Sequence, residues 1–312
     1  MDSAKTKTNT VFSRILRRLW KEKALWLMVL PGVIWYLVFR YLTMVGVVIA
    51  FQRYTVSTKF LQGQWVGLRY FQQFFRSESC WKIIRNTFLI SFYGLIFGFP
   101  APIILALLLN EQKDGPFKRV VQTISYLPHF ISTVILVSMF VQFLSVSNGL
   151  INNLVEFFGG TRTYFLGDPK YFRTLYTCLG IWRGIGWGSI IYLAALTNVS
   201  PELYEACLID GGGRLRQTWH VTLPGISNTI IIMLIFRVGE LLSVGSETIL
   251  LMYNEAIYET ADVISTYVYR RGLINAEYSF GAAVGLFNSL IGLTLVATTN
   301  ALAKRFSETS LW

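Results

Sequence analysis

The sequence of 312 residues is 53% hydrophobic and only 14% charged, which leaves too little polar surface for a soluble fold of this size. Its formal charge of +11 raises the question of nucleic acid, but seven of the 28 basic residues lie in the first 23 positions, beside an apolar segment. Basic residues in that place favour a cytoplasmic anchor on anionic membrane lipid, with no nucleic-acid partner. The composition therefore predicts an integral membrane protein.

Six apolar segments are long enough to cross a bilayer, which takes about 20 residues per helix. Six crossings place both ends of the chain on one side, and the basic N-terminus predicts that this side is the cytoplasm. We therefore expect an all-α fold, an integral membrane bundle of six transmembrane helices. The expected spans are Leu25 to Ala50, Thr87 to Leu109, Val120 to Leu144, Leu175 to Leu196, Ile226 to Leu251 and Ala282 to Leu302.

The chain divides into four segments in this interpretation. Residues 1–24 form a basic cytoplasmic segment, 25–85 hold the first transmembrane helix and an outer loop, 86–303 form the core domain, and 304–312 form a cytoplasmic tail. The outer loop departs from the expected charge distribution, because its six bases face only one acid, although long translocated loops often escape that rule. The six bases are Arg53, Lys59, Arg69, Arg76, Lys82 and Arg85.

The loop between the fourth and fifth spans has a pattern of its own. Ser200 and Pro201 are typical of a helix start, and the three glycines at 211–213 end that helix. A second short helix follows and stops before Pro224. The pattern predicts a hairpin of two helices on the cytoplasmic surface of the membrane.

This hairpin carries a signature that resembles the cytoplasmic loop of binding-protein-dependent ABC importer permeases. The family pattern is Glu-Ala-Ala, three residues, Gly, nine residues, Ile, any residue and Leu-Pro, and the spacing here fits throughout. A cysteine stands for the second alanine and a valine for the isoleucine, and both should keep the helix packing. The aspartate before the glycine is similar to the Asp-Gly pair that is usual in the carbohydrate group of these permeases, which is maltose-permease-like. The matching residues are Glu205, Ala206, Cys207, Asp210, Gly211, Val221, Leu223 and Pro224.

The resemblance implies a permease subunit of an ATP-driven importer in a bacterial cell membrane, which forms half of the translocation path for a sugar, in particular an oligosaccharide. It implies three kinds of partner: a second permease subunit in a heterodimer, two ATP-binding subunits that dock on the hairpin, and an extracytoplasmic solute-binding protein. ATP and Mg would bind to the partner ATPase. The chain lacks Gly-Lys-Ser/Thr, so we expect no catalytic residue, cofactor or metal in it.

Charged residues inside the expected spans are candidates for the translocation path, because a charge at a helix centre costs a few kcal/mol or more. A continuous fifth helix would place Glu240 and Glu247 nearly in line, with Arg237 one turn earlier. This stripe either lines the path and contacts hydroxyl-rich cargo, or it forms structural ion pairs in which two arginines balance two glutamates. The candidate path residues are Arg183, Arg237, Glu240, Ser243 and Glu247.

Three alternative functions remain open at this point. A secondary transporter driven by an ion gradient would use Glu240 and Glu247 as ion sites, but it leaves the hairpin signature unexplained. An intramembrane enzyme would need a nucleophile, base or metal cluster, and the only two histidines, His129 and His220, are far apart in the sequence. An ABC permease for a solute other than a sugar is the third.

Overall fold

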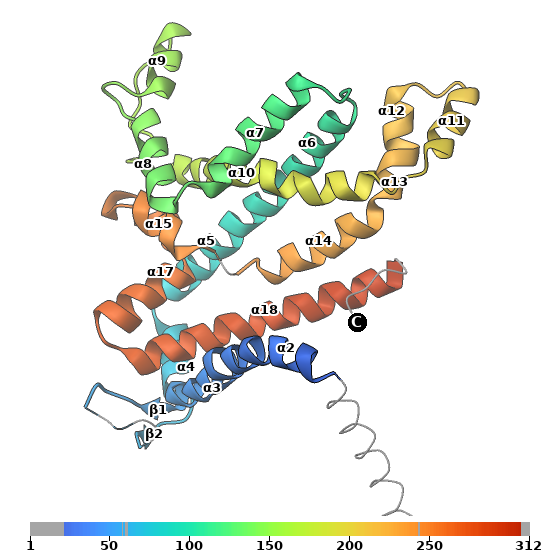
Figure 1. Cartoon of the computed structure of the whole chain (residues 1–312). Coiled ribbons are helices and arrows are strands. Elements are labelled where there is room, and N and C mark those ends of the chain that lie inside the picture. Colours follow the sequence, from blue (N-terminus) through green and yellow to red (C-terminus); the bar gives the residue numbers. More distant parts are fainter. Residues whose placement is uncertain (1–21, 58, 60–61, 243, 307–312) are drawn as a thin grey trace, which may run out of the picture.

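The computed structural model describes residues 22–57, 59, 62–242 and 244–306. Long helices dominate this part of the chain and form one bundle (Figure 1). Four helices are long and apolar enough to cross a membrane, and two bent helix pairs raise the number to six if each pair is one span. The all-α membrane bundle predicted from the sequence is therefore confirmed. Residues 1–21 of the expected basic segment and 307–312 of the expected tail lie outside the described residues.

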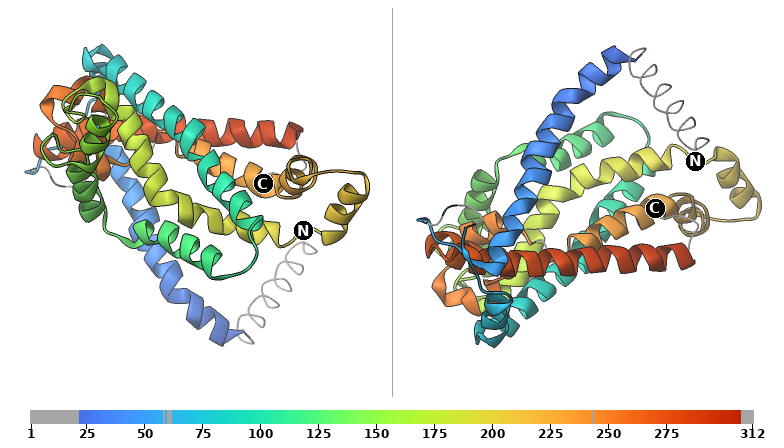
Figure 2. Two further views of the ribbon diagram at one scale, coloured as in Figure 1. Left: turned by 90° about the horizontal axis from the view of Figure 1, so that it is seen from above. Right: turned by 90° about the horizontal axis from the view of Figure 1, so that it is seen from below.

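The first half of the chain begins with an apolar helix at the edge of the bundle. α2 buries none of its residues, and the chain packs against the last helix through the 3-10 stretch that follows (Figure 2). A small antiparallel ribbon and an amphipathic helix then lead into the second span. The elements are α2 (Lys23–Tyr36), a π-helical turn (Leu37–Tyr41), α3 (Leu42–Met44), the 3-10 stretch (Val45–Phe51), β1 (Gln52–Arg53), β2 (Gln64–Trp65), α4 (Arg69–Arg76), α5 (Ser79–Tyr93), a π-helical turn (Gly94–Gly98), α6 (Pro100–Asn110), α7 (Pro116–Phe130), α8 (Thr133–Phe143) and α9 (Leu150–Phe157).

The second half contains the two longest helices, α10 and α18, which run along the bundle. The start of α2, the end of α18 and the helices α11 and α12 lie at one end, which we call the hairpin end, while β1, β2, α4 and α9 lie at the other, the ribbon end (Figure 1). The elements are α10 (Pro169–Leu196), α11 (Pro201–Ile209), α12 (Arg214–Gln217), a π-helical turn (Thr218–Thr222), α13 (Leu223–Gly225), α14 (Ser227–Gly239), α15 (Ser246–Met252), a 3-10 turn (Glu255–Ile257), α16 (Tyr258–Ala261), α17 (Ile264–Val268), a π-helical turn (Tyr269–Ile274) and α18 (Tyr278–Phe306).

Three clusters of buried apolar side chains hold the bundle together. One lies between α8, α10 and α15 and includes Leu136, Phe172 and Ile249. A second, at the ribbon end, contains Phe74 of α4 among aromatic rings of the last helices. The third, at the hairpin end, includes Ile226 and joins α6 and α10 to the hairpin. Each end of the bundle therefore has its own core.

The third expected span, Val120 to Leu144, is not one helix. α7 and α8 meet at an angle of 109°. Ile131 is in an extended conformation, and Ser132 starts the new helix by accepting a hydrogen bond from the backbone N–H of Ile135 at 3.4 Å. A serine cap of this kind stabilises a helix start, so a break is favoured where apolar length alone predicts continuity.

The fifth expected span is also broken, because α14 ends at Gly239 and α15 begins only at Ser246. Gly239 packs directly on Val296 of α18, where a larger residue has no room. The irregular backbone between the two helices needs partners for its polar groups inside a membrane. Three carbonyls obtain them from other helices: Ser91 donates to Leu241, Asn288 to Leu242 at 3.2 Å, and Ser265 to Val244 at 2.9 Å.

Asn288 offers a test of how this break is stabilised. We expect Asn288→Leu to lower the stability of the permease by about 1 kcal/mol, because the Leu242 carbonyl loses its donor in a water-poor place. The control is Ser289→Ala, since Ser289 donates only to Gly285 of its own helix. Thermal melting in detergent measures the difference, and equal melting temperatures for the two variants would contradict this account.

Small residues spaced four apart in a membrane helix usually allow another helix to pack closely. The glycines of α10 follow this expectation only in part. Gly180 and Gly184 have no atom within 4 Å of where a Cβ would lie, so they do not bring helices together. Gly186 does, because its Cβ would overlap the Ser125 carbonyl group of α7. The close approach of α10 to α7 therefore depends on a glycine outside the repeating pattern. Of the spaced glycines, Gly180 and Gly184 leave open space, whereas a Cβ at Gly188 would lie 3.0 Å from Pro102 of α6.

Candidate functional site

The hairpin signature forms two short helices joined by a tight turn. α11 ends in a double hydrogen-bonded turn, in which Gly212 N–H donates to the Cys207 carbonyl at 2.8 Å and Gly211 N–H to the Leu208 carbonyl at 3.0 Å. Gly211 has φ +75°, a left-handed conformation that favours glycine. Asp210, directly before it, is the last residue of the helical turn. The glycine of the signature is therefore a geometric requirement of the turn.

The apolar residues of the signature hold the hairpin on the bundle. Val221 and Leu223 pack against the cluster around Ile226 at the hairpin end. The Tyr204 hydroxyl lies 3.1 Å from the Thr222 hydroxyl and joins the two arms of the hairpin. Pro224 lies in the short helix that leads directly into α14. The segment Arg214–Gly225 and α14 meet at an angle of 64°, so the hairpin joins the membrane span directly but through a bend at Ile226.

Several large apolar side chains of the hairpin are exposed and belong to none of the core clusters of the described residues. Ile209 and Leu215 are 87% and 88% exposed, and Trp219 is 70% exposed. Glu205 and Ala206 are also exposed on α11, while Cys207 is partly buried. Apolar side chains gathered in this way are typical of a protein interface. We name this group, Leu208, Ile209, Leu215 and Trp219, the apolar hairpin face.

A cavity of about 470 Å³ lies between α5, the π-helical turn after it, α10 and α14. Arg237 and Glu240 line it at the end of α14. Tyr176 and three glycines of α10, Gly180, Gly184 and Gly188, line it from the facing side. Its volume is within the range of small-molecule sites, about 300–1,000 Å³. The break in the fifth span is therefore located where the chain borders open space. The remaining lining residues are mostly apolar side chains of the same helices.

The other expected path residues lie elsewhere. Arg183 lines a smaller adjoining pocket of about 80 Å³ with Thr248, and this pocket shares Tyr176 with the cavity. Glu247 is exposed on α15 and lines neither space, and Ser243 lies outside the described residues. The structure thus brings together Arg237 and Glu240, with Arg183 next to them.

The expected stripe on one continuous helix is wrong, because α14 ends before Glu240 and Glu247 begins the separate α15. The structural ion pairs are absent too: within the described part of the chain, Arg183 and Arg237 form no ion pair with Glu240 or Glu247. Local hydrophobicity hid the break, since residues 241–252 are almost as apolar as the helix before them.

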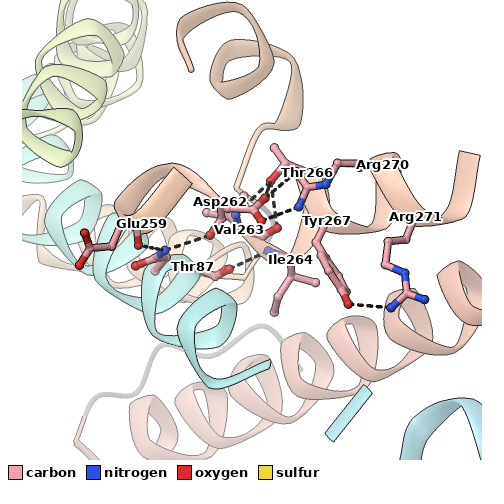
Figure 3. Close-up of polar contacts among 10 residues, drawn as sticks. Thr87, Glu259, Asp262, Val263, Ile264, Thr266, Tyr267, Arg270 and Arg271 are labelled. Carbon is pink, nitrogen blue, oxygen red and sulfur yellow. Dashed lines mark hydrogen bonds and ion pairs between the residues drawn. The ribbon is translucent and has the colours of Figure 1, made fainter. Parts of the chain in front are cut away.

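A buried polar network near the ribbon end was not expected from the sequence (Figure 3). The Asp262 carboxylate accepts from Arg270 at 2.6 Å and from the Thr266 hydroxyl at 2.8 Å. Burial alone would lower the pKa of Arg270, but the hydrogen bond and charge of Asp262 outweigh it and raise that pKa. The pair is therefore a stable ionic contact.

The same network connects this segment to the second span. Asn86 of α5 donates to the carbonyls of Glu259 and Asp262 at 2.8 and 3.1 Å, and Ile264 N–H donates to the Thr87 hydroxyl at 3.0 Å. Figure 3 shows Thr87 of α5 beside Ile264, at the start of α17, with Glu259 of α16 and Asp262 close by. The sequence signal that could have predicted this network is the Asn-Thr pair at the start of an apolar span, because buried polar groups need hydrogen-bond partners. The network fixes the ribbon end of the bundle.

No group of three or more histidine, cysteine or acidic side chains that could hold a metal occurs in the described residues. A bundle of membrane spans with a surface hairpin at one end and a cavity beside a broken helix has the architecture of a transporter subunit. The chain belongs to the family described as "Binding-protein-dependent transport system inner membrane component", which matches residues 98–308. The resemblance to importer permeases drawn from the hairpin signature is therefore confirmed.

Similar proteins match nearly the whole chain. The polygalacturonan/rhamnogalacturonan transport system permease protein YteP of Bacillus subtilis (strain 168) is 46% identical over 96% of this chain and 93% of that protein. Protein LplB of the same organism is 43% identical over 94% and 92%. In the crystal structure of a bacterial alginate ABC transporter with its alginate-bound periplasmic protein, one chain is 41% identical with a TM-score of 0.88, over 96% of this chain and all of that one.

Proposed function

We propose that this chain is one of two permease subunits of an ATP-driven oligosaccharide importer, and that the cavity is its half of the translocation path. The similar proteins are described as transporters of polygalacturonan/rhamnogalacturonan and of alginate, which supports a carbohydrate cargo. An extracytoplasmic solute-binding protein would deliver that cargo, as in the alginate complex. A second, different permease would cover the open side of the cavity.

The observation that carries this proposal is that the hairpin joins the start of α14 through a bend of 64°, while the cavity lies at the other end of α14. Pro224 and Gly225 lead from the hairpin into α14, and Arg237 and Glu240 line the cavity at its other end. A rigid helix passes the displacement of one end to the other, which alternating access requires. A partner that moves the hairpin would therefore change the shape of the path.

The energy source in this proposal is a partner chain. An ATP-binding subunit with ATP and Mg would dock on the apolar hairpin face, one on each permease, and this places the hairpin end and both chain termini in the cytoplasm. The permease itself transports without catalysis, as its similarity to permease proteins supports. A carrier driven by an ion gradient would leave the exposed Ile209 and Leu215 without a partner.

A charge placed on the apolar hairpin face tests the proposal. We expect Ile209→Asp or Leu215→Asp to reduce the ATP-binding subunit that co-purifies with the permease at least tenfold, because a carboxylate would be desolvated in the interface. The control is Phe157→Asp on α9, which is equally exposed (82%) but lies at the ribbon end. Undiminished ATPase recovery with both hairpin variants would rule out this docking surface.

A further inference from the structure

The cavity contains an arginine, Arg237, that forms no ion pair with any described residue. Glu240, three residues later, lines the same cavity but lies beyond the end of α14 and does not pair with it. A charge in a membrane span is costly unless it has a partner or water. The arginine is therefore placed for a ligand that is not part of the chain.

The position of Arg237 is built by a glycine on the facing helix. One guanidinium nitrogen lies 3.1 Å from where a Cβ of Gly94 would be, so a side chain at that position would press on it. Gly94 also begins the π-helical turn that borders the cavity. The guanidinium thus lies close to bare backbone and is directed into the space between α5, α10 and α14.

Two more arginines extend the positive charge along α10. Thr177, Gly180 and Gly184 line the cavity from one face of α10. Arg173 lies one turn before Thr177 on the same face, next to the cavity lining but not part of it. It lies on the ribbon-end side of the cavity. Its Nη2 donates to Asn86 at 3.1 Å, but its buried Nε has no partner.

Arg183 contributes a positive charge next to the cavity. It lines the adjoining pocket, which shares Tyr176 and Gly180 with the cavity. Only one acid, Glu240, lines the cavity. The charged groups on and beside the path therefore favour an anion, with one carboxylate left to accept hydroxyl hydrogen bonds.

We propose that Arg237 binds a carboxylate of the cargo, and hence that the importer selects oligosaccharides that contain uronic acid. This inference rests on the proposed function. A guanidinium matches a carboxylate with two parallel hydrogen bonds, whereas the hydroxyls of a neutral sugar leave its charge uncompensated. Arg173 adds positive charge on the ribbon-end side of the cavity, and Arg183 adds charge beside it.

Binding to the purified importer, assembled with its partner subunits, tests the inference by titration calorimetry. The probes are trigalacturonate and trimannuronate, each paired with its neutral trimethyl ester. We expect the wild type to bind at least one acid tenfold or more tighter than its ester, Arg237→Gln to lose that preference, and Arg237→Lys to keep part of it. Arg69→Gln removes an exposed charge at the ribbon end and should leave the preference intact.

Two results would overturn the inference. One is equal binding of acids and esters by the wild type, and the other is an acid preference that Arg237→Gln leaves unchanged. Yield and co-purified ATPase establish that each variant is assembled. The charge substitutions on the hairpin test the proposed function without any cargo, so the two proposals can fail separately.

Discussion

Replacement of Gly186 by leucine should remove the folded permease from detergent extracts. A Cβ at this position would overlap the Ser125 carbonyl group and come within 2.8 Å of the Tyr126 nitrogen, both on the backbone of α7. A side chain could relieve the overlap by changing its rotamer, but the backbone of a helix cannot. α7 and α10 must therefore separate along their contact. Overpacking of a well-packed core costs about 1–3 kcal/mol or more. Size-exclusion chromatography of the extract measures the loss.

Gly184 is the matched control, because it lies on the same helix and has no atom within 4 Å of its Cβ position. Gly184→Leu should give a normal yield and a single symmetric peak. It should nevertheless impair uptake, since the leucine would occupy the cavity that Gly184 lines. A normal yield of Gly186→Leu, or a poor yield of Gly184→Leu, would contradict these roles.

Apolar length predicted where the spans lie but not where they bend. The third and fifth spans are interrupted because local polar groups compete with helix continuation: Ser132 caps a new helix in one, and three carbonyls find donors on other helices in the other. Those donors, such as Asn288, are distant in sequence. Hydropathy cannot represent a partner that only the fold supplies.

The candidate sites were predictable to different degrees, because sequence patterns describe local structure and not the contacts between distant helices. The hairpin is local, so the spacing of its glycines and prolines was enough to predict two helices and a turn. The path residues depend on which helices meet, and of the four that the structure describes, Arg237 and Glu240 border the cavity. Glycine spacing was misleading for Gly180 and Gly184 but not for Gly188, which lies against Pro102. The sequence does not tell whether a small residue faces another helix or open space.

The hairpin turn provides the second large expected effect. Gly211→Val should reduce co-purified ATPase and uptake at least tenfold while the permease stays in the membrane at its normal level. Its φ of +75° is unfavourable by about 1–2 kcal/mol for ordinary residues and worse for β-branched ones. Valine would therefore unwind the turn that holds Gly212 N–H 2.8 Å from the Cys207 carbonyl and orients α11 relative to α12.

Gly211→Asn separates this conformational effect from a need for space. Asparagine adopts the left-handed conformation more readily than other residues with a side chain, and no atom lies within 4 Å of the Cβ position at Gly211. We therefore expect Gly211→Asn to retain most ATPase recovery and uptake. A defect as severe as that of valine would show that the partner requires the bare backbone itself, whereas full activity of both variants would remove the turn from the coupling mechanism.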